Sequence, residues 1–256
     1  YSAVSCGFQM EPIKKILIAE DGRKFYVRSL NEDFHTQFGF VAKAALAKAD
    51  AGDVLKTNTG KGLFVSEPSF IDSYGRIKRA PQIIPRKDVA AIVAETGIGK
   101  GSIVVDAGTG SGALSLFLAN IAKKVVTYEI RDDFAAIAEE NVKLLGMKNI
   151  VLKKKDIYNG IDEKDVDIVT LDLPEPWKAV EPAAKALKVG GFIVSYSPTI
   201  PQISDFIAAV AKNKSLLLIK TIEIIEREWE LNDRVVRPKS QQIGHSGFLT
   251  FVRKIR

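Results

Sequence analysis

The chain has 256 residues, of which 46% are hydrophobic and 27% charged, and its formal net charge is +6. This length suits one large domain with a small addition, and no apolar run approaches the roughly 20 residues of a membrane span. The single cysteine, Cys6, excludes an internal disulfide and a cysteine zinc site. With two histidines and no basic, apolar leader, we expect no metal, no membrane association and a cytoplasmic location.

Residues 1–75 are predicted to form a small β-rich module. Residues 13–19 and 24–28 read as two short strands joined by a turn, and residues 41–49 as an Ala-rich helix. Acidic and basic side chains balance in this part, so the excess positive charge lies in residues 76–256. Basic character of this kind permits a polyanionic partner.

Residues 76–256 alternate between strand-like and helix-like patterns, which predicts a doubly wound α/β sheet. The expected strands cover residues 103–106, 125–130, 150–153, 166–173, 192–197, 216–225 and 247–253. The expected helices cover residues 87–96, 113–121, 132–145, 179–187 and 202–212. The segment between the last two strands is expected to be a polar loop.

A glycine-rich turn follows the first of these strands. The apolar run that starts at residue 103 ends in Asp106 and turns through Gly108, Gly110 and Gly112. Such glycines let the backbone approach a nucleotide-like cofactor closely. The spacing from Gly108 to Ala113 also fits the dinucleotide fingerprint, so the glycines alone do not separate a dehydrogenase from a methyltransferase.

Acidic residues at the ends of successive strands favour the methyltransferase. They are Asp106, Glu129, Asp156 and Asp172. Asp106 would face a pyrophosphate in a dinucleotide enzyme, whereas it suits the cationic methionine end of S-adenosylmethionine, directly or through water. Glu129 suits ribose hydroxyls and Asp156 an adenine amino group. We therefore predict a class I (Rossmann-like) methyltransferase sheet of seven strands with a small N-terminal β-rich module.

The sequence Asp172-Leu-Pro-Glu-Pro-Trp177 resembles the Asp/Asn-Pro-Pro-aromatic loop of amino-methyltransferases. The whole chain resembles the tRNA (adenine-N1)-methyltransferases that modify position 58 of the T-loop, and in some archaeal members also position 57. Further motifs that carry the resemblance are Asp33-Phe-His-Thr36 with Gly39, Arg79-x-Pro-Gln82 with Lys87-Asp88, Arg227-x-Trp229, Arg237-Pro238 and Gly244-His-Ser-Gly-Phe-Leu249.

The resemblance implies a cofactor site, a catalytic residue and an assembly. The implied contacts with S-adenosylmethionine are Gln82, Asp106, Gly108, Gly110, Ser111, Gly112, Ala113, Glu129, Asp156 and Asp172. Asp172 is also the implied catalytic residue, because a carboxylate that accepts from adenine N6–H stabilises the positive charge that develops as N1 is methylated. The resemblance also implies that the small module of residues 1–75 helps to bind tRNA, and relatives imply a homotetramer.

The expected tRNA contacts are Arg76, Arg79, Arg86, Trp177, Arg234 and Arg237. Arg86 and Pro85 stand where some relatives carry an aromatic residue or histidine beside the target base. Trp177 is either a packing residue or an adenine platform, and His245 is interpreted as structural. Two alternative functions stay open: a protein carboxyl (isoaspartyl-type) methyltransferase, and a non-catalytic RNA-binding partner subunit.

Overall fold

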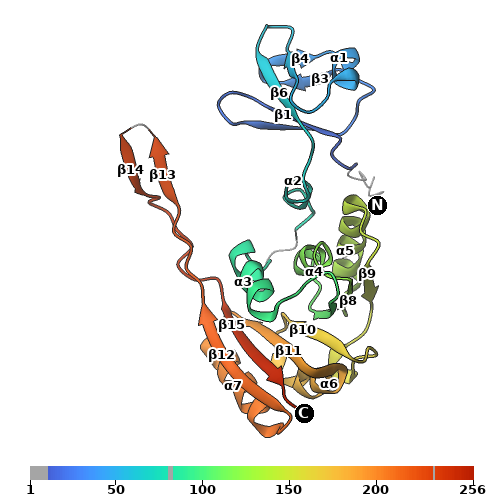
Figure 1. Ribbon diagram of the computed structural model, residues 1–256, viewed down its shortest axis with the longest axis vertical. Helices are drawn as coiled ribbons and strands as arrows, with labels where there is room; N and C mark the ends of the chain where they lie inside the picture. The colour runs from blue at the N-terminus through green and yellow to red at the C-terminus, as the bar shows by residue number, and fades with distance from the viewer. Residues whose placement is uncertain (1–10, 80–82, 233) are drawn as a thin grey trace, which may run out of the picture. The chain divides into compact units, whose positions relative to one another are not determined.

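The computed structural model describes residues 11–79, 83–232 and 234–256 (Figure 1). Within the chain, residues 1–77 and 78–256 form two compact units. This division falls two residues beyond the boundary expected from the sequence. In the described residues, no helix is both long enough and apolar enough to cross a membrane.

The N-terminal unit is built on a small antiparallel sheet with the strand order β2-β1-β6-β5. Its strands are β1 (Lys15–Ile18), β2 (Lys24–Val27), β5 (Val54–Lys56) and β6 (Gly62–Ser66). A separate hairpin, β3 (Phe34–Thr36) and β4 (Gly39–Val41), and two short helices, α1 (Lys43–Lys48) and α2 (Phe70–Tyr74), complete the unit. Leu17, Leu46 and Leu63 are fully buried in its core.

The C-terminal unit contains the predicted sheet of seven strands, in the order β12-β15-β11-β10-β7-β8-β9. The strands are β7 (Ile103–Ala107), β8 (Lys124–Tyr128), β9 (Ile150–Lys153), β10 (Val166–Leu171), β11 (Leu187–Ser197), β12 (Leu216–Glu223) and β15 (Phe248–Lys254). β15 runs antiparallel to β11 and β12, and the other pairings are parallel. The predicted fold class is confirmed.

Helices cover both faces of this sheet (Figure 1). They are α3 (Arg86–Thr96), α4 (Ala113–Ala119), α5 (Asp132–Leu145), α6 (Val180–Ala186) and α7 (Ile200–Lys212), with 3-10 turns η1 (Ile157–Asn159) and η2 (Pro176–Ala179). Because successive side chains of a strand point to opposite faces, Val104 packs in the cluster with α3 and α4, and Val105 in the cluster with α6 and α7.

Two segments differ from the sequence expectation. The expected polar loop contains a hairpin, β13 (Trp229–Asn232) and β14 (Val235–Pro238), which projects from the end of β12 in Figure 1. In β13 apolar residues alternate with polar ones, a short strand pattern that the nearby charges of Arg234 and Arg237 obscured. In addition, β11 starts at Leu187 because Gly191 lets the chain lie against the Asp167 carbonyl, 2.8 Å from where a Cβ would sit.

The strand order also places the functional site. From β7 the chain passes through α4 to β8 on one side, whereas β10 lies on the other side of β7. At such a switch point the connections leave in opposite directions and open a crevice at the carboxyl ends of the strands. The segments that follow β7 and β10 therefore meet there.

Candidate active site

The glycine-rich loop after β7 lies directly against the end of β10. Gly108 has a φ of +86°, and a Cβ on it would stand 1.9 Å from the carbonyl oxygen of Asp172. The backbone N–H of Asp172 in turn donates to the carbonyl of Ala107, at 2.9 Å. Only glycine fits this contact. Gly110 is different, because its Cβ would approach no described atom more closely than 3.9 Å, although its φ is +53°.

The loop continues into α4 and holds a buried, unpaired hydroxyl. Ser111 is 2% exposed, and its Oγ has no hydrogen-bond partner among the described residues. The Ser111 carbonyl is held by the buried side chain of Asn141, whose Nδ2 donates to it at 2.8 Å. Gly112 (φ +80°) is the N-cap of α4, and Ala113 begins the helix. A buried hydroxyl without a partner is a site that a bound polar ligand would satisfy.

Asp106 is enclosed by hydroxyl groups. The side chain of Ser115 donates to its carboxylate, as do those of Thr127 at 2.8 Å and Thr170 at 2.6 Å. The residue is 1% exposed, and burial raises the pKa of its carboxyl group. The sequence analysis expected this carboxylate to meet the cofactor. The arrangement favours a role in fixing the ends of β7, β8 and β10, because these hydroxyls occupy most of its acceptor capacity and the residue is almost inaccessible.

Glu129, which follows β8, ties that strand to the glycine-rich loop. Its carboxylate accepts the backbone N–H groups of Gly110, Ile130 and Arg131, each at 2.9 Å. Asp156 stands one strand further along, after β9, and caps η1 by accepting the backbone N–H of Tyr158 at 2.9 Å. Both acids therefore order the backbone at strand ends. Glu129 also lines the cavity described next.

A cavity of about 420 Å³ opens at these strand ends. Its lining residues are Ile83, Ile84, Gly108, Gly110, Glu129, Ile130, Arg131, Phe134, Asp172, Leu173, Pro174, Tyr196, Pro198 and Gln202. The structure thus brings together Gly108, Gly110, Glu129 and Asp172, as the sequence predicts. The sequence analysis missed Tyr196, the penultimate residue of β11, and Pro198, which follows that strand. Because β11 is the neighbour of β10, the strand-end rule extends to both residues.

Asp172 differs from the other two acids near the glycine-rich loop. It is partly buried, and in the described part of the chain no donor contacts its carboxylate. Burial, with a smaller contribution from the charge of Asp106, raises the pKa of Asp172 to about 7. Asp172 lines the cavity, and the described residues leave the acceptor capacity of its carboxylate unused.

The remaining predicted residues do not all share this cavity. Gln82 lies outside the described residues. Arg76 belongs to the N-terminal unit, where its guanidinium stacks over the Tyr26 ring at 3.9 Å. In the C-terminal unit, Arg79 and Arg86 are exposed, and Arg234 is exposed at the turn between β13 and β14.

Arg237 is exposed on β14, where it pairs with Glu230 at 2.9 Å. Trp177 lies in η2 and lines a second hollow of about 410 Å³, together with Lys178, Lys212 and Lys214. Among the described residues, the linings of this hollow and of the Asp172 cavity have no member in common. This placement favours packing or a surface role for Trp177 over a platform beside Asp172.

Residues 76–236 match the family model described as tRNA methyltransferase complex GCD14 subunit. The chain belongs to this family. It is 37% identical to the tRNA (adenine(57)-N(1)/adenine(58)-N(1))-methyltransferase TrmI of Methanocaldococcus jannaschii, over 93% of this chain and 94% of the relative. It is also 37% identical to the tRNA (adenine(58)-N(1))-methyltransferase TrmI of Thermus thermophilus, over 86% of this chain and 88% of the relative.

Solved structures show the same fold. A SAM-dependent O-methyltransferase from Thermotoga maritima superposes with a TM-score of 0.84 at 30% identity, covering 97% of this chain and 95% of its own. The tRNA (m1A58) methyltransferase TrmI of Aquifex aeolicus superposes with a TM-score of 0.77 at 24% identity, covering 97% and 99%. The match extends over both units of the chain.

The contact between Gly108 and Asp172 predicts different costs for two glycine substitutions. Gly108→Ala places a methyl group 1.9 Å from the Asp172 carbonyl, so the ends of β7 and β10 must separate. We expect it to lower the melting temperature (Tm) clearly and to abolish cofactor binding. Gly110→Ala, with the same left-handed backbone but open space at Cβ, is the matched control, and its cost is about 1 kcal/mol. Equal losses of Tm in the two variants, measured by calorimetry, would contradict this account.

The raised pKa of Asp172 predicts a pH-dependent stability. Because the charged form is disfavoured in the folded protein, the wild type loses stability as pH rises from about 4, the ordinary aspartate pKa, through about 7, the folded one. Asp172→Asn carries no such penalty. Its Tm should therefore exceed that of the wild type by several degrees more at pH 8 than at pH 5. Asp205→Asn, on the exposed side of α7, is the control, and a constant difference for Asp172→Asn would refute the assignment.

Proposed function

We propose that this chain transfers the methyl group of S-adenosylmethionine to N1 of adenine 58 in the T-loop of tRNA, and also to adenine 57. The observation that carries the proposal is the unpaired carboxylate of Asp172 in a cavity beside the glycine-rich loop. The names of the archaeal and bacterial relatives support adenine N1 as the acceptor, and the archaeal name supports both positions.

The residues present fit the cofactor. The loop from Gly108 to Gly112 offers close backbone approach, and the buried Ser111 hydroxyl offers an unused hydrogen bond. We assign the methionine portion to this loop and Ala113, the ribose to Glu129, the adenine to Asp156 and a part in closing the site to Gln82. S-adenosylmethionine supplies a methyl group that is electrophilic because it is bonded to a cationic sulfur.

Asp172 provides what the acceptor requires. Adenine N1 attacks through an in-plane lone pair, so no proton has to leave beforehand, and positive charge then develops over N1 and the exocyclic amine. The carboxylate of Asp172 accepts from N6–H and stabilises this charge more in the transition state than in the ground state. The low polarity that raises its pKa also strengthens this interaction. Pro174, fixed by the Gln202 side chain at 3.0 Å, shapes the same edge of the cavity.

Basic side chains supply the binding energy for a large polyanion. We propose that five exposed arginines contact tRNA phosphates: Arg76 in the N-terminal unit and Arg79, Arg86, Arg234 and Arg237 in the C-terminal unit. Trp177, in η2, is proposed as a further tRNA contact. Contacts of this kind position the nucleic acid without reading its sequence. We place the protein in the cytoplasm with its tRNA substrate.

The Asp172 carboxylate is tested by nucleoside analysis. Unmodified tRNA transcript is incubated with labelled S-adenosylmethionine, digested and analysed by mass spectrometry. We expect 1-methyladenosine from the wild type and a turnover at least about 100-fold lower from Asp172→Ala, with cofactor affinity changed by less than about threefold. Asp205→Ala is the control. Equal losses of turnover and cofactor affinity would refute the catalytic role.

The same experiment separates the alternative functions. Cofactor binding without any labelled nucleoside would favour a protein carboxyl substrate, as in isoaspartyl methyltransferases. Failure of the wild type to bind S-adenosylmethionine in titration calorimetry would favour a non-catalytic RNA-binding subunit. Mapping of the label to position 57, position 58 or both tests the two-site part of the proposal.

We further propose that the protein is a homotetramer in which the β13–β14 hairpin makes a subunit contact. Leu231 is 75% exposed, its cross-strand partner Val236 is 63% exposed, and Trp229 is 51% exposed. An isolated two-stranded hairpin with apolar side chains on its surface is marginally stable in water. A second copy of the chain would cover these side chains.

Substitution of the hairpin tests this assembly. We expect the wild type to sediment as four copies of the 28.0 kDa chain. The double variant Leu231→Ser/Val236→Ser should sediment as a smaller species while its circular dichroism stays native. Val189→Ser removes an exposed apolar side chain of β11 and is the control, because Val189 lies away from the hairpin and is 63% exposed. A monomeric wild type, or a tetrameric double variant, would exclude this role of the hairpin.

A further inference from the structure

An ion pair at the first turn of α3 is buried and fully hydrogen-bonded. The Lys87 ammonium lies 2.8 Å from a carboxylate oxygen of Asp88, whose residue is 0% exposed. The other two N–H groups of Lys87 reach the carbonyl of Ile224 at 2.7 Å and the hydroxyl of Ser246 at 2.6 Å. Ser246 in turn donates to the second oxygen of Asp88 at 2.8 Å. The pair therefore joins α3 to the segments that follow β12 and precede β15.

The segment held by this ion pair carries Tyr196 of the cavity wall. The Tyr196 hydroxyl donates to the carbonyl of Ser246 at 2.7 Å. A Cβ on Gly247 would lie 2.4 Å from the Tyr196 ring, so the backbone there is pressed against the aromatic edge. Burial raises the pKa of Tyr196 to about 12, which keeps the phenol protonated and donating. The ion pair of Lys87 and Asp88 holds Ser246, and Ser246 in turn fixes the orientation of the Tyr196 ring.

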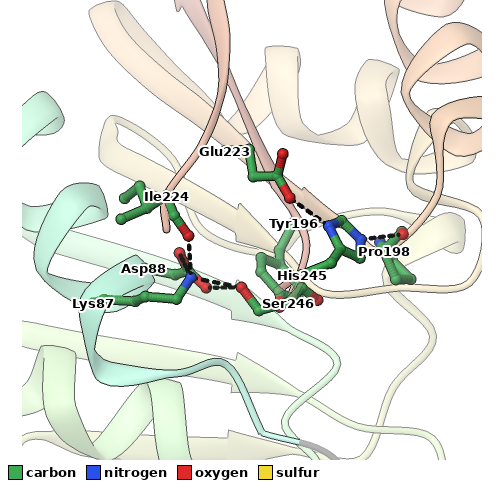
Figure 2. Close-up of polar contacts among 8 residues, drawn as sticks. All are labelled: Lys87, Asp88, Tyr196, Pro198, Glu223, Ile224, His245 and Ser246. Atoms are coloured by element: carbon green, nitrogen blue, oxygen red, sulfur yellow. Dashed lines mark hydrogen bonds and ion pairs between the residues drawn. The ribbon is translucent and has the colours of Figure 1, made fainter. Parts of the chain in front are cut away.

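His245 holds Pro198, a second residue of the cavity lining, through a hydrogen bond (Figure 2). Its Nδ1 lies 2.6 Å from the carboxylate of Glu223, and its Nε2 lies 2.9 Å from the carbonyl of Pro198. Both partners are acceptors, so the ring uses both nitrogens as donors in its protonated form. The carboxylate of Glu223 raises the pKa of His245, and Lys87 opposes this. The carbonyl of Pro198 is therefore held from the side of β12.

We call the four residues Lys87, Asp88, His245 and Ser246 the α3–β15 cluster. None of them is among the described residues that line the Asp172 cavity. Through Tyr196 and Pro198, however, the cluster determines where part of that lining stands. Figure 2 shows the two sets of contacts side by side, with Tyr196 and Pro198 at the end of β11.

We propose that the α3–β15 cluster positions the acceptor base, by fixing Tyr196 and Pro198 in the cavity that contains Asp172. This inference rests on the proposed function, because it requires an acceptor base in that cavity. Alignment of N1 with the methyl group depends on the walls of the cavity, and a displacement of about 1 Å costs about 100-fold in rate. Affinity for tRNA, in contrast, comes mainly from phosphate contacts elsewhere. The cluster should therefore affect kcat, and not the KM for tRNA.

Two variants test the cluster. Ser246→Ala removes the hydroxyl that bridges the ion pair. Lys87→Met/Asp88→Asn removes both charges together, so that no isolated buried charge is left to unfold the protein. We expect each to lower kcat by at least about tenfold, with less than about twofold change in the KM for tRNA and in the Kd for S-adenosylmethionine. Thr221→Val is the control, because it removes a hydroxyl contact at 3.0 Å between β12 and β15 outside the cavity lining, and its kcat should equal that of the wild type.

The measurements separate the possible failures. A kcat within twofold of the wild type in both folded variants would overturn the positioning role. Parallel losses of kcat, cofactor affinity and Tm would overturn it too, because they indicate a purely structural contribution. A wild type that binds S-adenosylmethionine and forms no 1-methyladenosine would instead overturn the proposed function, before any variant is compared.

Discussion

At the carboxyl ends of β7 and β10 the backbone of Gly108 lies so close to the carbonyl of Asp172 that there is room for a hydrogen atom but not for a methyl group. This contact joins the glycine-rich loop, to which we assign the cofactor, to the residue for which we propose the catalytic role. The distance between the loop and Asp172 is therefore set by backbone, which is stiffer than any pair of side chains. Gly110, Glu129 and Asp106 each act by holding one of the strands that meet there.

Three carboxylates stand near this contact, and their partners decide what each can do. Asp106 is surrounded by hydroxyl donors and Glu129 by backbone N–H groups, so both serve the local order of the strand ends. Asp172 has no donor in the described part of the chain, so its burial raises the pKa of its carboxyl group. An acid that is costly to ionise in the free protein gains most from a partner that brings a proton donor or a positive charge.

Much of this site follows from the sequence, because strand ends are recognisable and the carboxyl ends of parallel strands converge. That rule predicted Glu129 and Asp172, the glycine spacing predicted Gly108, and the strand-end rule could also have predicted Tyr196. It could not assign partners to Asp106, since Thr127 and Thr170 come from two other strands and nothing in a linear pattern states which hydroxyls will meet. The β13–β14 hairpin was missed because the charges of its arginines masked a short alternation of apolar residues.

The position of β15 determines how the sheet can be completed. β12 pairs with β15, and β15 pairs with β11. Within the described sheet, β12 is therefore joined to the other strands only through a strand that follows it in the chain. Pairings between segments that are distant in sequence are slow to form. Ser246 precedes β15 by two residues and arrives with it, so the wall that carries Tyr196 is locked by the same event that closes the sheet. The position of Tyr196 therefore depends on the pairing of β15, whereas the contact between Gly108 and Asp172 involves only the ends of β7 and β10.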